Sequence, residues 1–347
     1  MSKTLFSQLA ATDFKKSIGF LTTGEEIFCF RLKNKNGMKL EVINYGATIT
    51  SLNIPIANKK KVDVVLGFEN LENYIDSFSL PNAPYLGALV GRYAGRINNA
   101  TFVLNGNKIV LTKNHGAHQI HGGVEGFSKA VWEVKTVTSN AIVLEYTSQD
   151  NEEHFPGVLT TQITYTLTDE NELKVEIIAK STEDTIINLT QHSYFNLDGH
   201  SETIVNQELF VNSSKTLETN IENIPTGRFF ELNRTPFDFN SQKECPTKID
   251  NTFVLNKETE IAATLFSTKN NLKMSVTTNQ PAVHIYVGGN CFNQIKGKEN
   301  ANYHPLSGIC FEAQNFPDAP NHENFPSSVL KKEETYLHNT VFKFENI

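Results

Sequence analysis

The segment TQITYTLTDENELKVEIIA, residues 161–179, decides the fold class of this chain. Residues 161–167 and 173–179 each place apolar side chains at alternate positions, with many β-branched and aromatic residues among them. Such alternation is typical of strands with one buried face. Because a short polar loop, residues 168–172, separates the two runs, the segment predicts a β-hairpin.

The same period of two recurs on both sides of this hairpin. Residues 38–43 and 141–146 alternate in the same way, and an early strand is expected near residues 26–32. Helical periodicity is limited to one or two turns at residues 71–75. Short strands at regular intervals indicate an all-β protein that is a large sandwich or barrel. Because no linker is evident, we expect residues 1–347 to form a single domain.

Composition limits the possible binding partners of the protein and the cellular compartment in which it is expected. The net charge of −7 argues against nucleic acid and anionic membrane surfaces as partners. No apolar run is long enough to span a membrane, and the first residues lack the apolar segment of a secretory signal. Four scattered cysteines, without a Cys-x-x-Cys pair, are expected to be reduced and mostly buried in a cytoplasmic protein: Cys29, Cys245, Cys291 and Cys310.

Two strand-like segments carry an ionisable side chain among apolar neighbours. His192 lies within INLTQHSYFNL, residues 187–197, and Glu312 lies within GICFEAQ, residues 308–314. Burial disfavours such groups unless they are paired, and an acid together with a base indicates proton-transfer chemistry. Taken singly, each has another explanation: a histidine satisfied by backbone groups, and a buried ion-pair partner.

Three histidines at a spacing of three residues, His115, His118 and His121, raise the question of a metal site. The glycines around them favour a loop, and no cysteine or carboxylate stands close by in the sequence. We therefore expect no metal here. The better interpretation is that one histidine points into a cleft and is held by the Gly122–Gly123 turn.

Arg92 and Arg96 occur in GRYAGRI, residues 91–97. A guanidinium group suits recognition of hydroxyl or carboxylate groups, but it also caps backbone carbonyls or pairs with an internal acid, and the residues alone favour this structural role. Asp250 could simply shape a turn. From the residues alone, the chain is a soluble β protein with a candidate histidine, glutamate and arginine site.

Taken together, the motifs resemble the galactose mutarotase (aldose 1-epimerase) family from about residue 37 to residue 344. Each motif is weak alone, but the ordered set is specific. The resemblance implies an all-β fold that is a large antiparallel β-sandwich, the galactose mutarotase-like supersandwich. The segments that carry it are residues 44–47, 63–68, 91–97, 121–123, 188–197, 249–253, 311–314 and 316–319.

The resemblance also implies a role for each site residue. His192 matches the catalytic acid of the family, and Glu312 matches its catalytic base. His121 matches a second active-site histidine near the sugar ring oxygen. Arg96 and Asp250 match residues that bind the sugar hydroxyls.

At three further positions the resemblance implies a weaker or a changed role in sugar binding. Arg92 matches a less direct position than Arg96. Gly95 stands where some members have a sugar-contacting asparagine, and His284 stands where some have glutamine. We expect His284 to be a substrate-binding residue, and both departures to tune which sugar is preferred.

The implied activity is that of an isomerase that interconverts α and β anomers of free aldohexoses such as galactose and glucose. The implied partner is a monosaccharide, with no metal or cofactor, for a protein that is a monomer or weak homodimer. Two alternatives remain: a hexose-6-phosphate 1-epimerase, which would need more basic residues, and a non-catalytic sugar-binding protein on the same scaffold. A glycoside hydrolase ranks lower, because it would usually need two carboxylates.

Overall fold

The computed structural model describes residues 14–256, 260–289 and 294–347. Within them strands dominate, and the helical turns expected near residues 71–75 are present as α1 (Leu71–Ser77), whose first turn is capped by the Asn70 side chain. Short 3-10 turns complete the described helical structure: Ala57–Lys59, Asn98–Ala100, Phe127–Lys129, Glu152–His154, Ile204–Asn206, Lys298–Asn300 and Ala319–Asn321. None of the helices in these ranges is long and apolar enough to cross a membrane.

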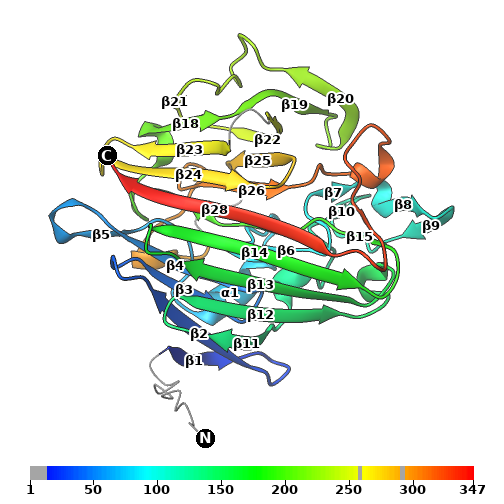
Figure 1. Cartoon of the computed structure of the whole chain (residues 1–347), viewed down its shortest axis with the longest axis horizontal. Helices are drawn as coiled ribbons and strands as arrows, with labels where there is room; N and C mark the ends of the chain where they lie inside the picture. Colours follow the sequence, from blue (N-terminus) through cyan, green and yellow to red (C-terminus); the bar gives the residue numbers. More distant parts are fainter. Residues whose placement is uncertain (1–13, 257–259, 290–293) are drawn as a thin grey trace, which may run out of the picture.

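The largest sheet has nine strands and contains the predicted hairpin as two neighbouring antiparallel strands, β13 (Leu159–Leu167) and β14 (Glu172–Ser181) (Figure 1). Leu167 pairs with Leu173 at the turn, as the polar loop predicts. In spatial order the strands are β11 (Glu133–Val137), β12 (Ala141–Ser148), β13 (Leu159–Leu167), β14 (Glu172–Ser181), β28 (Tyr336–Asn346), β24 (Leu272–Thr278), β23 (Ile261–Ser267), β18 (Gln207–Val211) and β21 (Lys243–Glu244).

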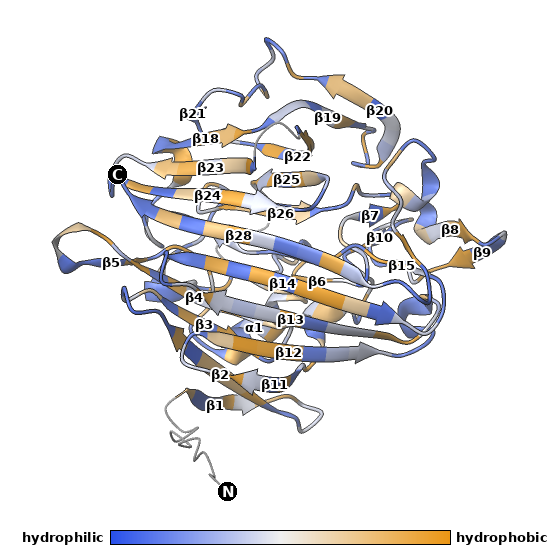
Figure 2. Ribbon diagram, in the orientation of Figure 1, coloured by the Kyte–Doolittle hydropathy of each residue, from blue (hydrophilic) through white to orange (hydrophobic). Residues whose placement is uncertain are grey.

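The alternating sequence of these strands separates a core face from a solvent face. Every second residue of β14 is buried, from Leu173 to Ser181, and β13 follows the same pattern. Figure 2 shows the result as bands of apolar and polar colour along β14 and β28. The period-two prediction for residues 161–179 is therefore confirmed in both strands.

The other two large sheets have six and five strands. The six-stranded order is β17 (Tyr194–Phe195), β26 (Ile309–Gln314), β25 (Ala282–Val287), β22 (Ile249–Leu255), β19 (Ser213–Thr219) and β20 (Pro225–Glu231). The five-stranded order is β1 (Lys15–Phe20), β2 (Glu26–Lys33), β3 (Lys39–Ile43), β4 (Thr48–Pro55) and β5 (Lys61–Asp63).

Four short strand pairs lie outside these three sheets. They are β7 (Arg96–Ile97) with β10 (Gln119–Ile120), β6 (Leu89–Val90) with β16 (Thr190–Gln191), β15 (Thr185–Ile186) with β27 (Val329–Leu330), and β8 (Thr101–Leu104) with β9 (Asn107–Val110). The first two pairs lie at the site described below.

One apolar core joins the three large sheets. It contains side chains from strands of each of them, among them Leu40, Val42, Ile163, Val175, Val276, Val283, Phe311 and Phe342. The all-β antiparallel sandwich expected from the sequence is thus confirmed. The nine-stranded sheet takes strands from both halves of the chain, which agrees with a single domain, but that division stays a prediction.

Candidate active site

Glu312 lies on β26, whose six residues are all buried. Alternation along the strand sends Ile309 and Phe311 into the main core, whereas Glu312 faces the opposite side. Its side chain is only 4% exposed although it lines a cavity, so the carboxylate is largely held away from bulk water.

His192 occupies a break between two short strands, and this differs from the strand-like run expected over residues 187–197. β16 pairs with β6 up to Gln191, and β17 then pairs with β26 from Tyr194. The Gln191 amide causes the change of partner, because its oxygen accepts from the Ser193 N–H and its nitrogen donates to the Gly87 carbonyl. The His192 backbone bonds to the 87–88 segment instead, and its ring is left free to point at β26.

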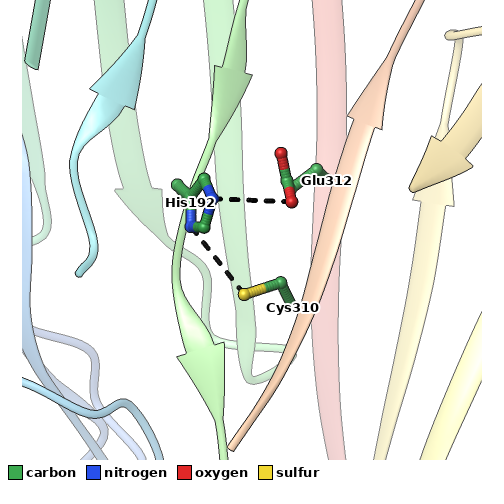
Figure 3. A group of neighbouring side chains, drawn as sticks. All are labelled: His192, Cys310 and Glu312. Atoms are coloured by element: carbon green, nitrogen blue, oxygen red, sulfur yellow. Dashed lines mark hydrogen bonds and ion pairs between the residues drawn. The ribbon is translucent and has the colours of Figure 1, made fainter. Parts of the chain in front are cut away.

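The two predicted catalytic side chains face one another (Figure 3). His192 Nε2 lies 3.5 Å from Glu312 Oε1, and both side chains are at most 5% exposed. The His192 ring is packed by Tyr194, Tyr85 and the ring of His121, whose centroid is 5.5 Å away. An acid and a base therefore lie close enough to act on neighbouring atoms of one small substrate.

His121 follows β10 and has a left-handed backbone, with φ of 53°. Gly122 next to it has φ of 85°, and any side chain there would collide with the Gly91 carbonyl, which explains the glycine. The Gly95 N–H donates to His121 Nδ1 at 3.3 Å, so the neutral ring carries its proton on Nε2. Burial, together with the charges of His192 and Arg96, places the pKa of His121 well below its usual value.

The two arginines of residues 91–97 separate into different roles. Arg96, on β7, faces the site, and its Nε is buried without a hydrogen-bond partner among the described residues. Arg92 is 2% exposed and donates to the carbonyls of Pro156 and Gly157, each at 2.9 Å. Burial lowers the pKa of Arg92 to about 10. The structural interpretation is therefore confirmed for Arg92 but not for Arg96.

Asp250 and His284 form a hydrogen-bonded ion pair on neighbouring strands β22 and β25. His284 Nε2 lies 2.9 Å from Asp250 Oδ1, and Nδ1 lies 2.9 Å from the Thr252 hydroxyl. Burial lowers the pKa of His284, but the bond to Asp250 and the charges of Glu312 and Asp250 outweigh it and raise the pKa overall. Burial raises the pKa of Asp250, but His284 and Arg96 leave it lowered overall. Asp250 does more than shape a turn.

All six side chains that the family resemblance assigned to the site line one cavity. Its wall includes Arg96, His121, His192, Asp250, His284 and Glu312. The register of the six-stranded sheet explains part of this, since His284 stands directly opposite Glu312 on one side and Thr252 on the other. Asp250 lies on β22 of the same sheet, whereas Arg96 comes from β7, His121 from the residue after β10 and His192 from the break between β16 and β17.

Sequence reasoning missed several residues that also line this cavity. Asn223 donates to Asp250 Oδ2 at 3.0 Å from the loop between β19 and β20. Tyr286 faces the cavity from β25, and Gln314 from β26, where its buried Oε1 has no hydrogen-bond partner among the described residues. Gln314 could have been predicted from the sequence, because it lies two positions beyond Glu312 on one strand and therefore faces the same side. No pattern in the sequence around Asn223 indicates that its side chain lines the cavity.

Gly95 also lines the cavity, and the structure gives a reason for the missing asparagine. Its φ is 79°, and a Cβ there would lie 2.9 Å from Pro317 Cβ and Cγ. Gly95 also supplies the N–H that bonds to His121. A side chain at this position would therefore have to displace Pro317 and the backbone that fixes His121.

The three closely spaced histidines do not converge on one point. His118 Nδ1 accepts from the Asn99 N–H, while His121 turns toward His192. Across the described ranges, the group whose potential metal-ligand atoms all lie within 4.8 Å of one another is His192, Cys310 and Glu312. The expectation that the protein needs no metal stays a prediction. Cys29, Cys245 and Cys310 are buried, as expected, and Cys291 lies outside the described residues.

Comparison with known proteins decides the family. A model of the family described as "Aldose 1-epimerase" matches residues 29–343. The chain belongs to the aldose 1-epimerase family. Galactose mutarotase of Bos taurus is 38% identical over 318 residues, covering 88% of this chain and 91% of the relative. Aldose 1-epimerase of Haemophilus influenzae is 35% identical over 333 residues, covering 90% and 94%.

Solved structures show the same fold. An aldose epimerase homologue from C. elegans has a TM-score of 0.86 at 29% identity, covering 92% of this chain and 99% of that one. Galactose 1-epimerase from Lactobacillus acidophilus has a TM-score of 0.82 at 28% identity, covering 95% and 98%. The family and these relatives support aldose 1-epimerase activity, an isomerase activity, and do not favour the hexose-6-phosphate or non-catalytic alternatives.

Proposed function

We propose that this aldose 1-epimerase interconverts the α and β anomers of free aldohexoses such as galactose and glucose. Glu312 is the catalytic base and His192 the catalytic acid. The observation that carries the proposal is their approach to 3.5 Å at the wall of a cavity lined with further polar side chains. A hexopyranose offers its anomeric hydroxyl and ring oxygen on one carbon atom, so a closely spaced base and acid can address both.

The reaction follows from this placement. The Glu312 carboxylate takes the proton of the anomeric hydroxyl, and the His192 imidazolium gives a proton to the ring oxygen. The bond between C1 and O5 breaks, and an open-chain aldehyde results. Rotation about the C1–C2 bond presents the other face of the aldehyde. The ring then closes with both proton transfers reversed, so no atom or electron is gained or lost.

The other cavity side chains hold the sugar. Arg96 has a buried donor and Gln314 a buried acceptor that lack partners among the described residues, and sugar hydroxyls would satisfy both. Asp250 is held by His284 and Asn223 and accepts from further hydroxyls. His121, with its proton on Nε2, donates near the ring oxygen. Such fixed orientation is itself a large contribution to catalysis.

The charge at the cavity favours a neutral sugar over a phosphorylated one. Arg96 is the one arginine or lysine among its described lining residues, and it faces the carboxylates of Asp250 and Glu312. We also propose that the enzyme acts in the cytoplasm as a single-domain monomer or weak homodimer. Cys29 and Cys245, which are buried and form no disulfide, support that compartment, and no metal, cofactor, nucleic acid or membrane takes part.

The test is the optical rotation of freshly dissolved α-D-galactose and α-D-glucose. The protein should speed the approach to equilibrium without changing the final rotation. A matched experiment with galactose 6-phosphate or glucose 6-phosphate separates the alternatives. Faster equilibration of the phosphorylated sugar than of the free one would overturn the proposed substrate class.

A further inference from the structure

Cys310 lies behind the proposed acid, on the side away from the sugar cavity. It precedes Glu312 by two positions on β26, so strand alternation places both side chains on one face. The cavity is lined by Glu312 and Gln314 but not by Cys310, which is fully buried in the second apolar cluster. A group in this position cannot contact the substrate, but it can act on His192.

One strand therefore meets both nitrogens of the His192 ring (Figure 3). Glu312 Oε1 lies 3.5 Å from Nε2, and Cys310 Sγ lies 3.8 Å from Nδ1, within the range of a sulfur hydrogen bond. Because the hydrogen bond at one ring nitrogen sets where the proton resides, the partner at Nδ1 decides what Nε2 can do. This partner is a thiol.

We infer that Cys310 is a positioning residue whose sulfur accepts the Nδ1–H of His192, so that Nε2 is the nitrogen that exchanges a proton with the sugar. The inference rests on the proposed function. It accounts for both directions of the reaction. After Nε2 has given its proton to the ring oxygen, the proton on Nδ1 stays in place, and the lone pair of Nε2 faces the sugar, ready to take the proton back on ring closure.

The weakness of sulfur as an acceptor suits this task. A carboxylate at Nδ1 would stabilise the imidazolium strongly and oppose proton donation, whereas a thiol holds the ring and adds no charge. The groups that face His192 from the surrounding elements are Glu312, His121, Tyr85 and Tyr194. Of these, Glu312 carries the negative charge, and it faces the other nitrogen.

The first arm of the test is kinetic and compares Cys310→Ala with Cys310→Ser. Loss of one neutral hydrogen bond predicts a kcat about 3- to 10-fold lower in the alanine variant. KM should stay within about twofold, because Cys310 does not line the cavity. Serine restores an acceptor and should recover part of kcat. Cys245→Ala is the matched control, since it removes a different buried cysteine that does not line the cavity and should leave kcat unchanged.

The second arm is independent of activity. ¹⁵N-histidine NMR at alkaline pH should show neutral His192 protonated on Nδ1 in the wild type, and a shift toward the Nε2–H tautomer in Cys310→Ala. The signal is assigned by its loss in a His192→Gln variant. An Nε2–H tautomer in the wild type, or an unchanged kcat and tautomer in Cys310→Ala, would overturn the inference. If the tautomer shift appears but the wild type does not accelerate mutarotation, the proposed function fails instead.

Discussion

The pair formed by His284 and Asp250 should make the stability of the fold depend on pH in a specific direction. The pKa of His284 is raised above its usual 6.5, so its stabilisation is fully present below pH 6.5 and is lost as pH rises through the folded pKa. The pKa of Asp250 is lowered below 3.8, so its stabilisation is present above pH 3.8 and is lost as pH falls through the folded pKa. The pair is strongest between these two values.

The perturbation that isolates this effect is His284→Gln, which keeps an amide donor but removes the charge. The amide would still donate to the charged Asp250 carboxylate, so the variant should lose the attraction between the two charges, roughly 1 kcal/mol. The side chains are 15% and 29% exposed, which leaves solvent screening smaller than at a surface pair. The loss should be present near pH 6, below the usual pKa of 6.5, and should decrease as pH rises through the folded pKa of His284, where the imidazole becomes neutral.

The assay is urea unfolding followed by the fluorescence of Trp132, the single tryptophan, which is 1% exposed. His338→Gln is a control with the opposite sign. Burial lowers the pKa of His338 to about 4, so wild type should lose stability relative to that variant as pH falls through 6.5. A free energy difference between wild type and His284→Gln that does not decrease as pH rises above about 6 would refute the proposed charged pair.

Three other changes have distinct expected results. Arg96→Ala should raise KM for galactose about 10-fold or more with little change in kcat, since it removes a charged donor to the sugar; an unchanged KM would remove Arg96 from the site. Arg92→Met should lower the free energy of unfolding by at least about 2 kcal/mol in urea titrations, because buried carbonyls lose their donors. Its KM for galactose should stay unchanged. Activity should survive dialysis against a chelator, and a loss restored by a divalent metal would contradict the metal-free mechanism.

Local pattern was enough to predict much of the fold. The hairpin at residues 161–179 follows from alternation and turn composition, and neither depends on distant parts of the chain. The roles of His192 and Glu312 came from the ordered family motifs, not from the residues alone. Their meeting in one cavity depends on the pairing of β17 with β26, which a single sequence does not specify.

The details that were not predicted arise from tertiary contacts. The break at His192 depends on a bond between the Gln191 side chain and the Gly87 carbonyl, more than a hundred residues earlier. The link between His284 and Asp250 depends on the register of β22 with β25. Asn223 reaches Asp250 from a surface loop. None of these leaves a periodic signal in its own segment.

The most direct test of the central claim follows the optical rotation of freshly dissolved α-D-galactose with wild type, His192→Ala and Glu312→Ala. Positioned acid and base groups each contribute about 10²- to 10⁴-fold, so each variant should lose at least about two decades of turnover while its circular dichroism stays that of the wild type. Wild type should reach the same final rotation sooner than buffer alone. Turnover near the wild-type rate in either folded variant would contradict the assigned acid and base.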